Sequence, residues 1–162
     1  MPEKQTIERA RRDKRQGKSA STQAGEFVRE EIEHIREGRH GARSTKQAIA
    51  IGLSKARRAG VKLEPSDDPP AATRRKAKQD LAAGEHPHEP AARRARATKK
   101  ALKKESTRAA SKTALSRQAK KAASQRTAGE RSAAAKKAAR TKGAAGRKAA
   151  AKKAARTRKR EA

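Results

Sequence analysis

The bulky apolar residues of this chain lie mainly between Phe27 and Leu63, and they follow a helical period there. Four of them share the spacing that places side chains on one face of an α-helix: Phe27, Val28, Ile32 and Ile35. The glutamates of the same segment fall on the opposite face: Glu26, Glu30, Glu33 and Glu37. Ser21 or Thr22 is suited to cap the start of this helix, and Gly38 is suited to end it. The pattern therefore predicts an amphipathic helix.

A second helix is predicted directly after the first. Ser44, with Gln47 three residues later, has the spacing of a capping box. Gly60 suits a left-handed C-terminal cap, and Val61 supplies the hydrophobic contact that usually accompanies it. The expected apolar stripe consists of Ile49, Leu53 and Ala56. Gly52 and Ala59 flank it, and these small residues would let another helix approach closely.

The joint between these two helices, residues 38–43, is short, so the helices should fold back on each other as an αα-hairpin. Ile51 points away from the apolar stripe, toward Arg58. An apolar residue in that position leaves a weak homodimer through the hairpin open as an alternative to simple exposure.

The segments on either side of the hairpin predict less structure. Residues 5–16 have helical potential but only Ile7 to bury, so residues 1–20 are predicted to be a basic arm that packs loosely if at all. Residues 65–90 hold five of the six prolines, which predicts a linker around one short helix at residues 72–83.

Charge separates the last segment from the rest. The chain has a net charge of +29, and residues 91–162 carry 26 Lys and Arg against 3 Asp and Glu. High charge with few bulky apolar residues is typical of disorder. The sequence therefore predicts a mainly α protein with four parts: residues 1–20 as the arm, 21–64 as the helical hairpin domain, 65–90 as the Pro-rich linker and 91–162 as an Ala/Lys/Arg-rich tail, largely disordered but with helix-forming potential.

The tail repeats the pentapeptide AKKAA, which begins at Ala119, Ala135 and Ala151. A spacing of sixteen residues is not a heptad multiple, so a coiled coil is not expected. Ala, Lys and Arg favour helices, whereas neighbouring like charges oppose them. We therefore expect the tail to gain helix on a polyanion, with Gly129, Gly143 and Gly146 dividing it into short pieces.

Residues 46–60, KQAIAIGLSKARRAG, resemble a block shared by a family of small, uncharacterised basic bacterial proteins. The block sits within residues 26–62, and the resemblance implies no particular activity. The Ala/Lys/Arg-rich tail is separately similar in composition to the tails of linker histones and their bacterial histone-like counterparts. That similarity implies condensation of DNA.

The charge pattern leads to the same function, because Lys and Arg neutralise phosphates and release condensed counterions. The predicted partner is double-stranded DNA bound without sequence preference, and the predicted location is the cytoplasmic nucleoid. The tail lacks the aromatic residues that stack single-stranded bases. The candidate contact residues are the tail cations of the repeats and C-terminus, with three from the hairpin: Lys120, Lys121, Lys136, Lys137, Arg140, Lys152, Lys153, Arg156, Arg158, Lys159, Arg160, Lys55, Arg57 and Arg58.

Two further function classes remain open. An RNA- or ribosome-associated basic protein would have a similar composition. A protein–protein module built on the acidic face formed by Glu30, Glu33 and Glu37 would use the tail as a tether.

Other chemistry is not expected from the sequence. There is no cysteine and no run of apolar residues long enough to span a membrane. His86 and His88 lie in the linker between Glu85 and Glu89, where flexibility and an intervening proline disfavour a metal site. His34 and His40 are expected at the surface. With no nucleophile–base pairing and no glycine loop for phosphate, no enzymatic activity, metal or cofactor is predicted.

Overall fold

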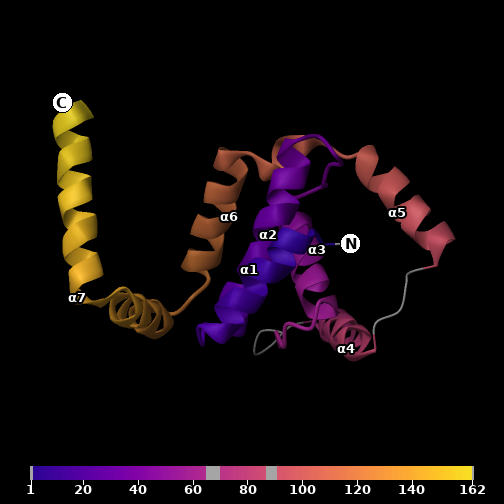
Figure 1. Cartoon of the computed structure of the whole chain (residues 1–162). Helices are drawn as coiled ribbons and strands as arrows, with labels where there is room; N and C mark the ends of the chain where they lie inside the picture. The colour runs from indigo at the N-terminus through magenta and orange to yellow at the C-terminus, as the bar shows by residue number, and fades with distance from the viewer. Residues whose placement is uncertain (1, 65–69, 87–90, 162) are drawn as a thin grey trace. The chain divides into compact units, whose positions relative to one another are not determined.

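The computed structural model describes residues 2–64, 70–86 and 91–161 (Figure 1). These residues form helices and no strand, which confirms the mainly α class. The helices are α1 (Lys4–Arg15), α2 (Ala20–Arg36), α3 (Thr45–Arg58), α4 (Ala71–Glu85), α5 (Ala92–Lys103), the 3-10 helix η1 (Thr107–Ala110), α6 (Lys112–Ser124) and α7 (Ala128–Glu161). The chain divides into two compact units, Met1–Gln118 and Ala119–Ala162.

In the first unit, α2 and α3 pack against each other as the predicted αα-hairpin. The cap of α2 is Ser19, which accepts the Thr22 N–H at 3.4 Å. It lies two residues before Ser21 and three before Thr22, the two predicted caps. At the start of α3, Ser44 accepts the Gln47 N–H at 3.2 Å, while the Gln47 side chain accepts from the Arg43 N–H. The Ser44 half of the predicted capping box is therefore present, and its reciprocal bond reaches one residue further back.

The end of α3 has the predicted left-handed cap. Gly60 has φ 84°, a value that residues with a Cβ rarely adopt. Its N–H donates to the Arg57 carbonyl, and the Val61 N–H donates to the Ala56 carbonyl, the two bonds of a Schellman motif. Val61 is buried beside Phe27 in one of two core clusters, so the cap also directs the chain back onto the hairpin.

The buried face of α3 agrees with the predicted stripe at Ala56, and with the predicted close approach at Gly52, but differs from it at Ile49 and Leu53. The buried positions are small residues at helical spacing: Thr45, Ala48, Gly52 and Ala56. Ile49, Ile51 and Leu53 are half-buried. Small side chains bring the two backbones together, since a Cβ on Gly52 would lie 2.6 Å from the Val28 Cα. The predicted weak homodimer through Ile51 stays a prediction.

One member of the acidic face predicted for α2 is buried: Glu30 is 2% exposed, whereas Glu33 and Glu37 are exposed. Glu31, which lies outside the predicted face, is 0% exposed. The Lys55 ammonium of α3 lies 2.6 Å from Glu31 Oε2 and 3.5 Å from Glu30 Oε1. The Glu30 carboxylate also accepts the Glu3 N–H at 3.0 Å. Buried carboxylates need ion-pair or hydrogen-bond partners. Lys55 of α3 supplies the charge, and the backbone N–H of Glu3 supplies a neutral hydrogen bond.

The prediction that the N-terminal arm packs loosely if at all is wrong, because α1 packs on α2. Thr6, Ala10 and Asp13 are buried, and Ala10 joins Phe27 in the first core cluster. Ala10 lies among basic residues in the sequence and has a small side chain, so the sequence did not identify it as an interior residue.

α4 packs against α3, so the helix expected at residues 72–83 belongs to the first unit. Residues 65–69 and 87–90 of the predicted linker lie outside the described residues. Asp80, 1% exposed, joins the two helices by accepting from Ser54 at 2.7 Å, Arg58 at 2.9 Å and Lys76 at 2.7 Å. Burial alone raises the pKa of Asp80, but these hydrogen bonds outweigh it, and the net pKa lies below the ordinary value.

Asp80→Asn should lower the free energy of unfolding by about 1–3 kcal/mol at pH 7, because it removes charge-assisted bonds. A carboxyl whose pKa is lower folded than unfolded stabilises the fold above its unfolded pKa, and this contribution is lost as pH falls through the folded pKa. Urea denaturation should therefore separate wild type from Asp80→Asn at pH 7 and bring them together in acid. Glu8→Gln, at an exposed carboxyl, is the control; an equal gap at both pH values would contradict the assignment.

η1 and the start of α6 lie on the second core cluster, which contains Ile35 and Ala110, with Leu115 of α6 packed against it. The end of α5 is joined to the first unit by a backbone hydrogen bond. The Gly41 N–H donates to the Leu102 carbonyl at 2.9 Å, and the Thr45 hydroxyl donates to the Ala109 carbonyl at 2.7 Å. A Cβ on Gly41 would overlap the Glu105 backbone. The first unit therefore extends into the segment that the sequence assigned to the tail.

The predicted disorder of residues 91–162 is not supported, because α5, η1, α6 and α7 occupy most of this segment. Ala, Lys and Arg are strong helix formers, and hydroxyl side chains cap successive starts. Ser106 accepts the Arg108 N–H before η1, and Ser111 accepts the Ala114 N–H before α6. Local propensity and capping outweigh the repulsion between like charges.

Candidate nucleic-acid interface

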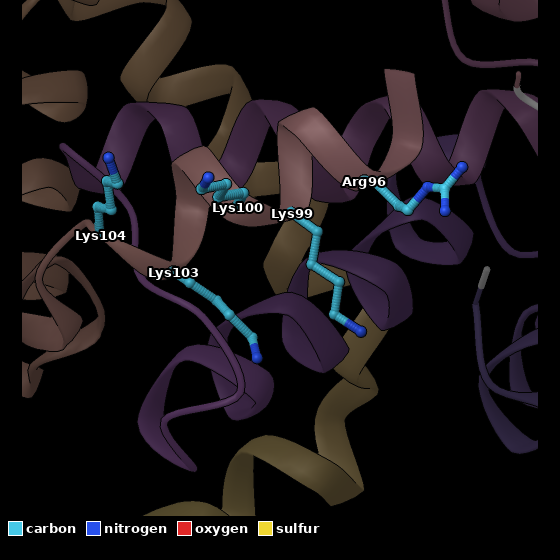
Figure 2. Close-up of a pocket in the computed structure, with 5 residues that line it drawn as sticks. All are labelled: Arg96, Lys99, Lys100, Lys103 and Lys104. Atoms are coloured by element: carbon cyan, nitrogen blue, oxygen red, sulfur yellow. The ribbon is translucent and has the colours of Figure 1, made fainter. Parts of the chain in front are cut away.

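Five cationic side chains line one open groove along α5 and the residue that ends it: Arg96, Lys99, Lys100, Lys103 and Lys104 (Figure 2). Their spacing repeats every three or four residues, so a helix places them on one face. All five are exposed, and no residue of α5 is buried. This basic α5 face has the charge and accessibility needed to contact a polyanion.

The sequence-based prediction did not include the α5 face, although the sequence contains the helical spacing of cations that identifies it. The search for repeated AKKAA drew attention to the later part of the tail, whereas residues 96–104 contain no such repeat. Placing them at 100° per residue gathers the five cations within one side of the helix.

The second unit carries most of the predicted contact residues. The first AKKAA repeat lies in α6, whereas the second and third lie in α7 on either side of Gly143. Eleven predicted contacts in this unit are exposed, and within the described part of the chain they form no ion pair: Lys120, Lys121, Lys136, Lys137, Arg140, Lys152, Lys153, Arg156, Arg158, Lys159 and Arg160. Their charges therefore face solvent.

A reciprocal capping box begins α7. The Thr127 N–H donates to Glu130 Oε2 at 2.7 Å, and the Glu130 N–H donates to Thr127 Oγ1 at 3.2 Å. The backbone bond from Thr127, with a further bond from its hydroxyl, lowers the pKa of Glu130. One of the few acidic residues of this segment thus serves to start a helix.

Gly143 interrupts α7, with φ 65° and ψ 172°. This combination is essentially restricted to glycine. The Arg147 guanidinium donates to the Ala139 carbonyl across the break at 2.6 Å. Gly129 and Gly146, which the sequence also proposed as dividers, lie within helical stretches, so Gly143 alone of the three breaks the helix.

Gly143→Ala should convert α7 into a continuous helix, because alanine favours helical angles and is strained at the observed ones. The chain has no cysteine, so spin labels on Ala134→Cys and Ala154→Cys report one distance. We expect that distance to lengthen to about 30 Å, the rise of twenty helical residues. Gly146→Ala is the matched control and should leave the distance unchanged. An unaltered distance in Gly143→Ala would show that the break has another cause.

The three hairpin cations predicted to contact DNA have partners within the protein. Lys55 pairs with Glu30 and Glu31. Arg57 donates to the Leu63 carbonyl at 2.8 Å, and Arg58 donates to Asp80. Their contact with DNA stays a prediction.

The histidines fall in two places. His34 and His40 have side chains 12% and 16% exposed, so both are half-buried where full exposure at the surface was expected. His86 is exposed, whereas His88 and Glu89 of the linker lie outside the described residues.

Comparison with known proteins identifies little beyond the hairpin. Residues 11–66 match the model of a family of unknown function (DUF6496), a minority of the chain that includes α2 and α3. No curated protein and no solved structure shows a significant match. Among the residues that the structure describes, no helix combines the length and the apolar character needed to cross a membrane.

Proposed function

We propose that this chain is a histone-like, nucleoid-associated protein of the cytoplasm that binds double-stranded DNA without reading its sequence. One observation carries the proposal: residues 91–162 hold 26 Lys and Arg against 3 Asp and Glu. Exposed helices present most of these cations to solvent. Phosphate neutralisation with counterion release would supply the binding free energy.

The helical state makes the cations dense enough for this role. The α5 face places five cations within nine residues, about 12 Å of helix. A duplex carries about seven phosphate charges over the same length. A similar density along α7, on either side of Gly143, would let two short helices contact successive parts of a curved duplex.

The side chains available favour duplex binding over the reading of bases. Residues 91–162 contain no aromatic residue on which an unpaired base would stack. Lys and Arg contacts to phosphate position a protein without carrying sequence information. The hairpin would hold α5 through Gly41 and Leu102, while Lys55, Arg57 and Arg58 would be secondary contacts.

The relationship to small basic bacterial proteins is also part of the proposal. The block at residues 46–60, which resembles that of small basic bacterial proteins, falls inside the segment that matches the family model. The model covers the hairpin and none of α5 to α7. The proposed DNA binding therefore depends on charge and exposure, with no support from that match.

A mobility-shift assay of the full chain across a salt series tests the proposal, with a chain ending at Gln118 for comparison. We expect the affinity of the full chain for duplexes of unrelated sequence to fall strongly as salt rises. The affinity of the shorter chain should depend less on salt. Preference for structured RNA at equal salt would favour the RNA- or ribosome-associated alternative. Indifference to both polyanions at physiological ionic strength would reject the proposal and leave the protein–protein module.

A further inference from the structure

Three potential metal ligands meet where α2 ends and the loop to α3 begins. Glu31 and His34 are three residues apart on α2, and His40 lies in the loop. One carboxylate oxygen and one nitrogen of each imidazole lie within 4.8 Å of one another. A Glu-x-x-His pair places both side chains on one helix face, an arrangement that helical metal proteins use.

The carboxylate of Glu31 is the unusual member of this cluster. It is 0% exposed, and neither oxygen has a hydrogen-bond partner. The ammonium of Lys55 lies 2.6 Å from Oε2 as an ion pair, which leaves Oε1 facing the histidines. A buried carboxylate oxygen without a hydrogen bond is costly, and a bound cation would offset that cost.

His40 has the geometry of a metal ligand. Its Nδ1–H can donate to the Gly41 carbonyl at 3.1 Å, which leaves the lone pair on Nε2. That nitrogen is 3.4 Å from Glu31 Oε1. Two ligands of a tetrahedral zinc ion, each about 2.0–2.2 Å from the metal, are about 3.3–3.6 Å apart. The pair is thus already at a ligand-to-ligand separation.

His34 is held by a carboxylate. Its Nε2 lies 3.0 Å from Glu3 Oε1 and 3.0 Å from the Arg39 guanidinium, and Arg39 donates to the same Glu3 oxygen at 2.8 Å. When Nε2–H donates to Glu3, Nδ1 carries the lone pair. Carboxylate partners of this kind orient metal-bound histidines and raise their basicity.

The surrounding charges permit a dication. Two cations, Lys55 and Arg39, lie beside the cluster, but Glu3, Glu30 and Glu31 lie there as well. The carboxylates outnumber the cations by one.

We propose that Glu31, His34 and His40 bind one divalent transition-metal ion of the zinc class, with water in any remaining position. Imidazole and carboxylate together suit Zn²⁺. The ion would join the loop to α2 directly beside Gly41, whose N–H holds the Leu102 carbonyl. Metal binding would therefore stabilise the surface on which residues 102–110 dock, whether or not the chain binds DNA.

The test is a titration of the metal-free full chain with Zn²⁺, followed by calorimetry and by metal analysis after dialysis. One ion per chain is expected. His34→Gln and His40→Gln each remove a direct ligand, so each should weaken binding by more than the roughly tenfold to hundredfold that loss of an outer-shell partner typically costs. His86→Gln is the matched control, since it removes an exposed histidine outside the cluster. Zn²⁺ should also raise the melting temperature of the wild type and of His86→Gln more than that of His40→Gln.

Circular dichroism shows whether each variant stays folded. Glu31→Gln is a secondary variant, because Glu31 also pairs with Lys55 and its loss could unfold the protein. In that case the two histidine variants alone test the proposal. Three results would overturn the proposal: no binding at micromolar Zn²⁺, wild-type affinity in both folded histidine variants, or loss of binding in His86→Gln.

Discussion

Five glutamine substitutions at exposed cations beyond Gly143 are expected to flatten the salt dependence of DNA binding: Lys152, Lys153, Arg156, Lys159 and Arg160. Each phosphate contact contributes about −0.9 to the slope of log K against log salt. Loss of five contacts should reduce the slope by about 4–5 and lower affinity by a hundredfold or more near 0.15 M salt. Glutamine has a helix propensity close to those of Lys and Arg, so α7 should persist.

A matched variant separates local contact from total charge. Replacing five exposed cations of α1 with glutamine removes the same net charge: Lys4, Arg11, Arg12, Lys14 and Arg15. We expect its slope to stay close to that of the wild type. Equal slopes for the α7 and α1 variants would mean that net charge alone governs binding, contrary to the proposed interface.

Glutamine substitution of the five cations of the α5 face, at residues 96, 99, 100, 103 and 104, tests which helices contact DNA. A reduction similar to that of the α7 variant would assign phosphate contacts to both units. A wild-type slope would confine the interface to the second unit and remove the α5 face from the proposal.

Gly52→Ala is expected to destabilise the first unit despite the better helix propensity of alanine. The added Cβ would lie 2.6 Å from the Val28 Cα and 3.0 Å from its nitrogen and Cγ2. Two of these atoms belong to the backbone, so α2 and α3 must separate. Overpacking of this kind costs about 1–3 kcal/mol, and the midpoint of urea denaturation should fall accordingly.

Gly25 provides the control, because it lies within α2 and a Cβ there would meet nothing within 4 Å. Gly25→Ala should raise the free energy of unfolding by about 0.5–1 kcal/mol. Equal stability of the two alanine variants would show that the close approach at Gly52 is not needed to hold the hairpin.

Local features of the fold were predictable where neighbouring residues decide them. The Ser44 cap, the Gly60–Val61 ending and the short joint between α2 and α3 all depend on contacts within a few positions. Periodicity also identified Phe27, Ile32 and Ile35 as interior residues, and all three are buried. Helix propensity competed with charge repulsion in the tail, and the prediction of disorder gave repulsion too much weight.

Features that depend on a second element were not predictable in the same way. Ala48 is buried in the cluster of Ile32 and Ile35, whereas the larger Ile49 is half-buried, because the distance between two backbones, rather than side-chain size, decides which face meets α2. Glu31 is buried because Lys55 of another helix lies beside its carboxylate. Hydropathy alone places a glutamate at the surface, and it carries no information about a partner 24 residues away.

The sequence by itself determined the helical class, the hairpin and the concentration of positive charge toward the C-terminus, because composition, period and caps act within one segment. Tertiary structure alone decided that α1 and α4 belong to the first unit, and it brought Glu31, His34 and His40 together. The physical reason is that burial and ion pairing depend on distances between segments, which residue spacing along the chain does not specify.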